Sequence, residues 1–247
     1  LFALAIQGAI LVARSRTEEH HRGQLDFAAF YLDDGVVAGS AAAARFFSDT
    51  FREEISALGL TLVVGKCVVV PAAGDAFAFS ADLFEGFEWK VGGGFKLLGA
   101  PFGDEAFCAA HTAKRVTKAE HLLCEIGAYA HTQGAMLLLR HCSSWSKLVF
   151  SARVVPPSLH SDALASFGVS IRRTLEQVMG ESISDRSWAL VQLGLAQGGM
   201  GIRNPVVHAP AAYLASLAAT NSLCCALDRG FDPSDQSSGL RKDFIED

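Results

Sequence analysis

Residues 25–38 read Leu-Asp-Phe-Ala-Ala-Phe-Tyr-Leu-Asp-Asp-Gly-Val-Val-Ala. Two short apolar runs, residues 25–31 and 36–38, are rich in aromatic and β-branched side chains and flank an Asp-Gly step. Such runs favour strands, and an Asp-Gly pair between them is typical of a tight turn. The sequence therefore predicts a β-hairpin that carries the adjacent carboxylates of Asp33 and Asp34 at its tip.

Two neighbouring carboxylates at the tip of an apolar hairpin are costly unless a positive charge lies against them. Mg²⁺ is the natural partner, because it takes hard oxygen ligands and commonly binds through one or two carboxylates together with substrate phosphates. Side chains alternate along a strand, so one of Asp33 and Asp34 is expected to be the main ligand. Taken alone, the pair is equally compatible with an ordinary turn in solvent.

The segments around this hairpin predict helices and strands in turn. Apolar residues 1–13 predict a buried helix that is too short to span a bilayer, which needs ~20 residues. Ser40 suits the N-cap of a second helix, and Gly59 suits its end. The valine-rich residues 61–70 predict a strand. The aromatic and glycine-rich residues 76–101 predict another hairpin, with residues 92–94 as a tight turn before residues 95–99.

Helical patterns dominate after Pro101. A periodic apolar face predicts one helix, and it comprises Val116, Ala119, Leu123, Ile126 and Ala130. Residues 136–150 predict a second helix, and a third ends at Gly180. Asn204 and Pro205 form a suitable start for a last helix. The fold class is therefore α+β, with a boundary where the helical block begins, after residue 103.

Composition and charge narrow the class of protein. The chain has 247 residues and is 50% hydrophobic, which indicates a folded globular protein. Its net charge is −5, yet residues 111–153 carry six basic and only two acidic side chains, so contacts with phosphates should concentrate there. The six cysteines form no metal-binding pattern. With no secretion signal recognised, we expect reduced thiols, an intracellular location and no membrane partner.

The stretch Phe30-Tyr31-Leu32-Asp33-Asp34 resembles the aromatic-x-Asp-Asp motif of reverse transcriptases (RNA-directed DNA polymerases) of the non-LTR retrotransposon type. Further stretches resemble blocks of that family in the same order, namely residues 1–5, 59–67, 97–103, 138–142, 198–202 and 211–216. The resemblance implies a partial polymerase palm in residues 1–103, made of antiparallel hairpins with packing helices. An all-helical thumb-like region would follow in residues 104–247.

By the same resemblance, Asp33 is the principal ligand and Asp34 its neighbour in a two-Mg²⁺ site. In the complete enzyme, this site transfers deoxynucleotides from their triphosphates to a DNA primer on an RNA or DNA template. Tyr31 would lie against the primer end. Lys66 would protonate or stabilise the leaving pyrophosphate; a solvated lysine at a strand edge is the simpler alternative.

The resemblance also implies nucleic-acid contacts outside the carboxylate hairpin. Leu98 and Gly99 would position the primer backbone, although a Leu-Gly turn is equally a packing feature. Lys114, Arg115 and Lys118 would contact phosphates of the template–primer duplex, with strongly salt-dependent affinity. A solvated helix face is the alternative explanation for these three basic side chains.

The sequence also departs from the family pattern. The family's further catalytic Asp and its Gln-Gly loop belong to a fingers and palm segment that would precede Leu1. Asp26 cannot replace that Asp, because it lies seven residues from Asp33 on one strand, ~23 Å away if extended. Val63 stands where the family usually carries Asn. We therefore expect this chain alone to be inactive as a polymerase.

Two other hypotheses remain open from the sequence. The chain could be a non-catalytic nucleic-acid-binding remnant that keeps the basic helix and has lost the chemistry. It could also be an unrelated α+β domain in which the Asp33-Asp34 hairpin is structural. A nucleic-acid-binding remnant predicts salt-sensitive duplex binding, which an unrelated domain does not. A polymerase remnant alone predicts a dependence on divalent cations.

Overall fold

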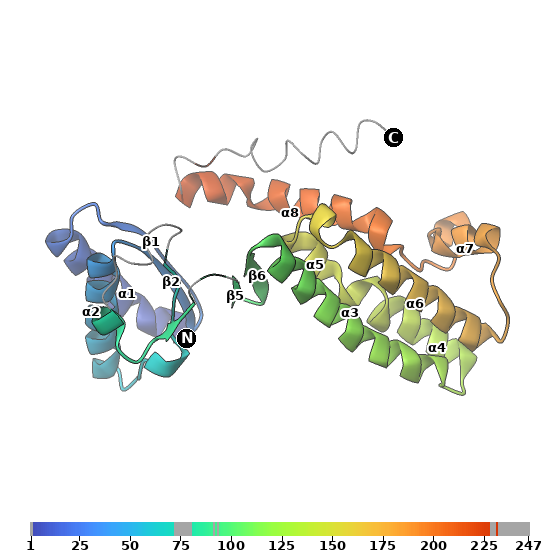
Figure 1. Ribbon diagram of the computed structural model, residues 1–247, viewed down its shortest axis with the longest axis horizontal. Helices are drawn as coiled ribbons and strands as arrows, with labels where there is room; N and C mark the ends of the chain where they lie inside the picture. Colours follow the sequence, from blue (N-terminus) through green and yellow to red (C-terminus); the bar gives the residue numbers. More distant parts are fainter. Residues whose placement is uncertain (1, 72–80, 91, 93, 228–230, 232–247) are drawn as a thin grey trace. The chain divides into compact units, whose positions relative to one another are not determined.

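The computed structural model describes residues 2–71, 81–90, 92, 94–227 and 231. It is a mixed α/β structure, 66% helical, with small antiparallel hairpins (Figure 1). The chain divides into two compact units, Leu1–Gly93 and Gly94–Asp247. The division lies ten residues before the boundary expected from composition, because the hairpin of residues 94–103 packs with the helices that follow it.

The first unit is built on two helices and a hairpin. Helix α1 spans Phe2–His20, strands β1 and β2 span Leu25–Tyr31 and Asp34–Gly39, and helix α2 spans Ala41–Ala57. Helix α1 continues past the predicted end at residue 13, because Ala13 and Thr17 follow Ile6 and Ala9 in its buried stripe. One cluster of buried side chains joins α1 to α2, and it comprises Ala9, Ala13, Phe47, Phe51 and Ile55.

The predicted carboxylate hairpin is present, and aromatic packing holds it on α2. Strands β1 and β2 pair antiparallel, with Tyr31 opposite Asp34 and Phe30 opposite Gly35. The Phe30 ring occupies the space beside Gly35, where an added Cβ would lie 2.3 Å from it. The same ring lies 5.0 Å from that of Phe51, centroid to centroid. This packing attaches the base of the tip to a buried helix.

The predicted limits of α2 are confirmed. The Ser40 side chain accepts a hydrogen bond from the backbone N–H of Ala43, which satisfies a helix-terminal donor. Gly59 follows the last turn with φ +75°, a left-handed conformation that glycine adopts without strain.

The strand predicted over residues 61–70 is mostly wrong. Residues Val64–Lys66 form a 3₁₀ turn, and only Val68–Val69, strand β3, pairs in parallel with β4, Glu88–Trp89. A second 3₁₀ turn, Ala81–Phe84, precedes β4. Valine favours extended structure, but a strand also needs a partner along its length. Residues 76–80, 91 and 93 of the predicted following hairpin lie outside the described residues.

The second unit begins with the hairpin of strands β5, Gly94–Leu97, and β6, Ala100–Gly103. Its two-residue turn consists of Leu98 and Gly99, with φ of +49° and +80°. Positive φ at both central residues belongs to the turn type that matches the twist of antiparallel strands. A hairpin was expected in this segment with its tight turn at residues 92–94, whereas the reversal falls at Leu98-Gly99.

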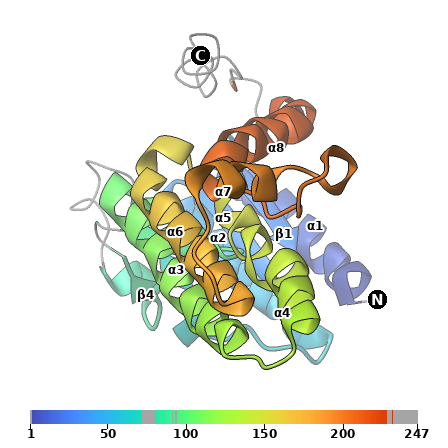
Figure 2. The same ribbon diagram turned by 90° about the vertical axis from the view of Figure 1, so that its right-hand side faces the viewer.

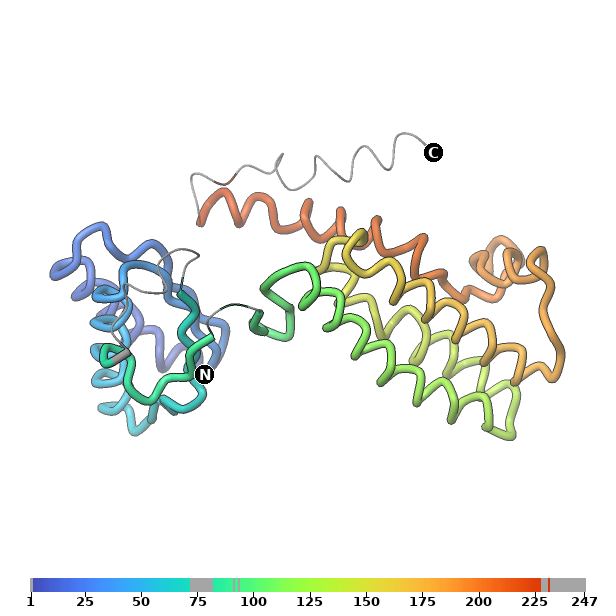
Figure 3. The backbone as a smooth tube through the Cα atoms, viewed as in Figure 1, coloured from blue at the N-terminus to red at the C-terminus, as the bar shows by residue number. Residues whose placement is uncertain are grey.

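Helices and short turns make up the described residues of this unit from Glu105 to Leu227 (Figure 2). The α-helices are α3 Glu105–Gly127, α4 Thr132–Leu138, α5 Val149–Val154, α6 Ser161–Met179, α7 Asp185–Gln192 and α8 Pro205–Leu227. A π-helical turn at Leu139–Ser143 and short 3₁₀ turns at Trp145–Lys147, Pro157–Leu159 and Leu195–Gln197 connect them, as the chain trace in Figure 3 shows. The helix predicted over residues 136–150 is thus interrupted.

One hydrophobic core joins these helices. Helix α3 packs along α6, and α5 packs along α8 (Figure 1). The large side chains in this core are almost fully buried, and they include Leu123, Leu139, Leu148, Phe167, Ile171 and Leu175. Helix α6 ends at Gly180 with φ +74°, as predicted.

Helix α8 starts at the predicted Asn204-Pro205 step, where the Asn204 side chain accepts a hydrogen bond from the N–H of Val206. Its first turns pack on the core through Pro205 and Ala209, and the remainder is exposed or half-buried. Within the described part of the chain, α8 is the one helix long and apolar enough to cross a membrane by length and composition.

Candidate functional site

The tip of the β1–β2 hairpin presents its acidic side chains to solvent. Asp33 and Asp34 are both exposed, and neither side chain has a hydrogen bond or ion pair among the described residues. Tyr31, directly opposite Asp34, is 66% exposed. The two carboxylates and the phenol ring are therefore accessible to a ligand that approaches the tip.

The turn itself is strained. Leu32 has φ +57°, while Asp33 has negative φ, so this two-residue turn places a branched side chain where glycine is normally found. Among the described residues, only Leu32 and Leu98 combine a side chain with positive φ. Strain of this kind costs of order 1–3 kcal/mol and clusters at functional sites. Leu32 and Leu98 both lie in hairpin turns that contain candidate site residues from the sequence analysis.

The two carboxylates at the tip suit a hard cation, but they are too few to bind it without further ligands. Two adjacent carboxylates supply the oxygen ligands that Mg²⁺ prefers, and this ion commonly binds through one or two carboxylates with other oxygens. Within the described ranges, no group of three or more His, Cys, Asp or Glu side chains could hold a metal ion. Asp33 and Asp34 therefore fit Mg²⁺ only if a substrate or another segment supplies further oxygens.

Lys66 lies in the same unit but is not joined to the hairpin tip. It ends the 3₁₀ turn Val64–Lys66 and is exposed. In the part of the chain that the structure describes, no hydrogen bond or ion pair connects it to Asp33 or Asp34. The structure thus separates this candidate from the carboxylates, on a turn in place of the predicted strand.

The second unit contains the remaining candidates. The Leu98-Gly99 turn lies near Phe150 of α5, whose ring would be 3.8 Å from a Cβ added to Gly99. On α3, Lys114 and Lys118 are exposed, and the Arg115 guanidinium lies over the Phe150 ring, 5.2 Å from its centroid. The turn and Arg115 thus both lie near Phe150, which their separation in sequence did not reveal.

Two residues of this basic region were missed from the sequence. The pKa of His111 is lowered first by burial and then by the positive charges of Lys96, Arg115 and Lys114. Lys96 of β5 therefore lies among the α3 cations, although 18 positions separate it from Lys114. His111 follows the buried Cys108 by three positions, a helical spacing, and that periodicity could have placed it on the buried face.

A second histidine lies deep in the helical core. His160 is 2% exposed, and its Nδ1 is 3.0 Å from the Thr112 Oγ1. Its Nε2 is buried and has no hydrogen-bond partner among the described residues. Burial lowers the pKa of His160 from 6.5 to about 4. This ring is neutral at physiological pH and is a structural group.

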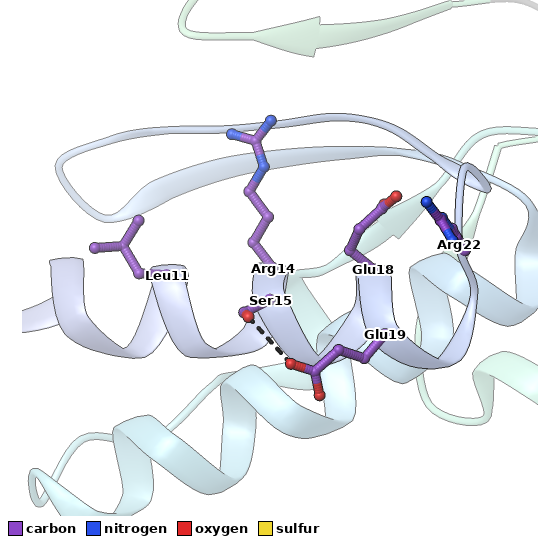
Figure 4. Close-up of a pocket in the computed structure, with 6 residues that line it drawn as sticks. All are labelled: Leu11, Arg14, Ser15, Glu18, Glu19 and Arg22. Atoms are coloured by element: carbon purple, nitrogen blue, oxygen red, sulfur yellow. Dashed lines mark hydrogen bonds between the residues drawn. The ribbon is translucent and has the colours of Figure 1, made fainter.

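A groove of the first unit lies elsewhere, along the second half of α1 (Figure 4). Its lining residues are Leu11, Arg14, Ser15, Glu18, Glu19 and Arg22. The Ser15 hydroxyl donates to Glu19 at 3.5 Å, the dashed line in Figure 4. Its lining contains two arginines and two glutamates, so its formal charges balance. The hairpin tip and the basic region around Phe150 remain the better candidates.

Comparisons of the chain with protein-family models, with curated protein sequences and with solved structures gave no match in any of the three. The residues and geometry described above therefore carry the functional argument.

Proposed function

We propose that the chain is the partial palm and thumb-like region of a reverse transcriptase of retroelement type. The complete, intracellular enzyme would extend a DNA primer on an RNA or DNA template from deoxynucleotide triphosphates. The observation that carries the proposal is the β1–β2 hairpin. Its strained tip exposes Asp33 and Asp34, unpaired, beside Tyr31, at the position where the sequence resembles the family's catalytic motif.

In this proposal the hairpin residues divide the work. The Asp33 carboxylate is the main Mg²⁺ ligand, and Asp34 is the second. When bound, Mg²⁺ stabilises the negative charge that develops as the primer 3′-hydroxyl attacks the α-phosphorus of the nucleotide and pyrophosphate leaves. Tyr31 supports the primer end with its exposed ring. Phe30, packed on Gly35 and α2, keeps the tip in place for both carboxylates.

Residues outside the hairpin have positioning roles. Leu98 and Gly99 hold the primer backbone at a turn, and Lys114, Arg115 and Lys118 contact phosphates of the duplex. No hydrogen bond or ion pair joins Lys66 to Asp33 or Asp34 among the described residues, so no observed contact supports its role at the leaving pyrophosphate. We therefore rank Lys66 below the other candidates.

Metal binding at the hairpin tip gives a direct test. Mn²⁺ replaces Mg²⁺ at oxygen sites and is detected by electron paramagnetic resonance. We expect the intact chain, in the presence of a primer–template duplex and a deoxynucleotide triphosphate, to bind Mn²⁺ more tightly than Asp33→Asn does, by tenfold or more. Asp26→Asn is the matched control, because Asp26 is an exposed carboxylate on the same strand. Equal Mn²⁺ affinity in the intact chain and Asp33→Asn would refute the proposed metal site.

A non-catalytic nucleic-acid-binding protein is the second candidate. The basic side chains of α3 favour it, because Lys114, Arg115 and Lys118 lie in the unit Gly94–Asp247, which has a hydrophobic core of its own. It predicts salt-sensitive duplex binding that Asp33→Asn leaves unchanged, with no Mn²⁺ bound at the hairpin.

A further inference from the structure

The β5–β6 hairpin is docked on α3 by close packing at its base. The Phe107 ring of α3 fills the space beside Gly94, where an added Cβ would lie 2.4 Å from it. The thiol of Cys108 lies 3.9 Å from the carbonyl oxygens of Pro101 and Gly103. These contacts hold the hairpin against the first turns of α3, so Lys96 on β5 has a fixed place relative to that helix.

Positive charge accumulates at this junction without a matching negative charge. Lys96 and Lys114 are exposed, and Arg115 lies on the Phe150 ring. None of these three forms an ion pair with a carboxylate among the described residues. Uncompensated cations from two separate elements are typical of sites that bind phosphate oxygens.

His111 is the buried member of this group. It is 8% exposed, and its Nδ1 is enclosed without a hydrogen-bond partner within the described residues. Buried polar atoms without partners are rare and need an explanation. Burial lowers the pKa of His111, and the positive charges of Lys96, Arg115 and Lys114 lower it further.

The other groups packed around the His111 ring add no free negative charge that would offset the three cations. One turn earlier, Cys108 is a neutral thiol, because burial and Asp104 raise its pKa. Asp104 is engaged as the α3 N-cap and accepts a hydrogen bond from the N–H of Phe107. Helix α5 contributes the Phe150 ring, and His160 before α6 is neutral beside Thr112.

We propose that Lys96, His111, Lys114 and Arg115 form one binding cluster for a nucleic-acid phosphate, in which His111 takes up a proton when the phosphate binds. A phosphodiester neutralises the repulsion from the three cations and adds negative charge beside the ring. Protonation of His111 then becomes favourable, and by linkage the affinity for the phosphate rises as pH falls. This inference rests on the proposed nucleic-acid function and adds Lys96 and His111 to it.

The test is duplex binding as a function of pH, measured by fluorescence anisotropy with a labelled primer–template duplex at constant ionic strength. One linked proton limits the effect to about tenfold in affinity per pH unit. We expect the intact chain to bind threefold or more tighter at pH 6.0 than at pH 7.5. His111→Gln, which cannot titrate, should lose most of that gain and bind like the intact chain at pH 7.5.

Charge variants test the cluster independently of the histidine. Lys96→Met should weaken duplex binding at pH 7.5 by threefold or more, whereas Arg186→Met, which removes an exposed charge from α7, should change it less than twofold. Circular dichroism at both pH values verifies that each variant is folded. A competition series with a free deoxynucleotide triphosphate distinguishes the phosphate sources: displacement at equal phosphate concentration would assign the cluster to free nucleotides and overturn the proposal.

The outcomes separate this inference from the proposed function. If His111→Gln keeps the full pH dependence, or Lys96→Met binds like Arg186→Met, the cluster is wrong even when Asp33 binds Mn²⁺. If the intact chain binds no duplex at either pH, both the cluster and the nucleic-acid function fail. If Mn²⁺ binding does not depend on Asp33 but duplex binding keeps its pH dependence, the proposed phosphate cluster stands and only the polymerase proposal fails.

Discussion

Acidification should destabilise the helical unit through His160. The ring is 2% exposed, its Nε2 is enclosed without a described partner, and burial lowers its pKa from 6.5 to about 4. In the unfolded chain the same imidazole takes up a proton at its ordinary pKa of about 6.5. Between these two values the unfolded state binds a proton that the folded state rejects.

The sign and size of the effect follow from this difference. Since the folded pKa is the lower one, the full stability is present above pH 6.5 and falls as the pH drops towards 4. Each unit of pKa difference corresponds to about 1.4 kcal/mol, so the limit for His160 is about 3 kcal/mol. Partial access of water to the ring would lower that value. For a domain of this size, the loss is a large part of its stability.

Urea unfolding followed by circular dichroism at pH 7.5, 6.0 and 5.0 measures the effect. We expect the free energy of unfolding to fall by about 1–2 kcal/mol between pH 7.5 and 5.0. In His160→Gln that His160-dependent part of the slope should disappear, although this variant starts from lower stability. His121→Gln is the control, because His121 is an exposed histidine on α3. A pH dependence that is the same in His160→Gln and in the control would refute the reasoning.

Two further predictions concern the carboxylate hairpin. Gly35→Ala should lower the free energy of unfolding by about 1–3 kcal/mol, because the added Cβ would lie 2.3 Å from the Phe30 ring; Gly65→Ala, with nothing within 4 Å, is the control in the same urea titration. The chain alone should show no primer extension above an Asp33→Ala background, because no third carboxylate joins Asp33 and Asp34 among the described residues. Detectable Asp33-dependent extension would contradict this.

Local features were the most predictable part of the fold. The hairpin of residues 25–39, the Ser40 cap, the stop at Gly180 and the start at Asn204-Pro205 all agree with the structure. Each depends on interactions within a few residues, such as a capping hydrogen bond or a left-handed glycine. Such short-range interactions can be predicted from the local sequence alone.

Elements that need a distant partner were less predictable. Residues 61–70 have the composition of a strand, yet only Val68–Val69 pairs, because the partner β4 offers just Glu88–Trp89. Likewise, α1 continues to His20 through charged residues, because its buried stripe packs on α2. In both cases tertiary packing overrides the local preference.

By itself, the sequence determined the position and chemistry of the Asp33-Asp34 hairpin, because two strand-forming runs around a short polar segment are a local property. The reversal itself falls at Leu32-Asp33, and the Asp34-Gly35 step begins β2. The tertiary structure decided that both carboxylates are exposed and unpaired on a strained turn, and that Lys66 does not contact them within the described residues. It alone brought Lys96 beside His111, since a hairpin must dock on α3 before their charges interact. Burial and charge proximity depend on which segments pack together, and that information is not local in the chain.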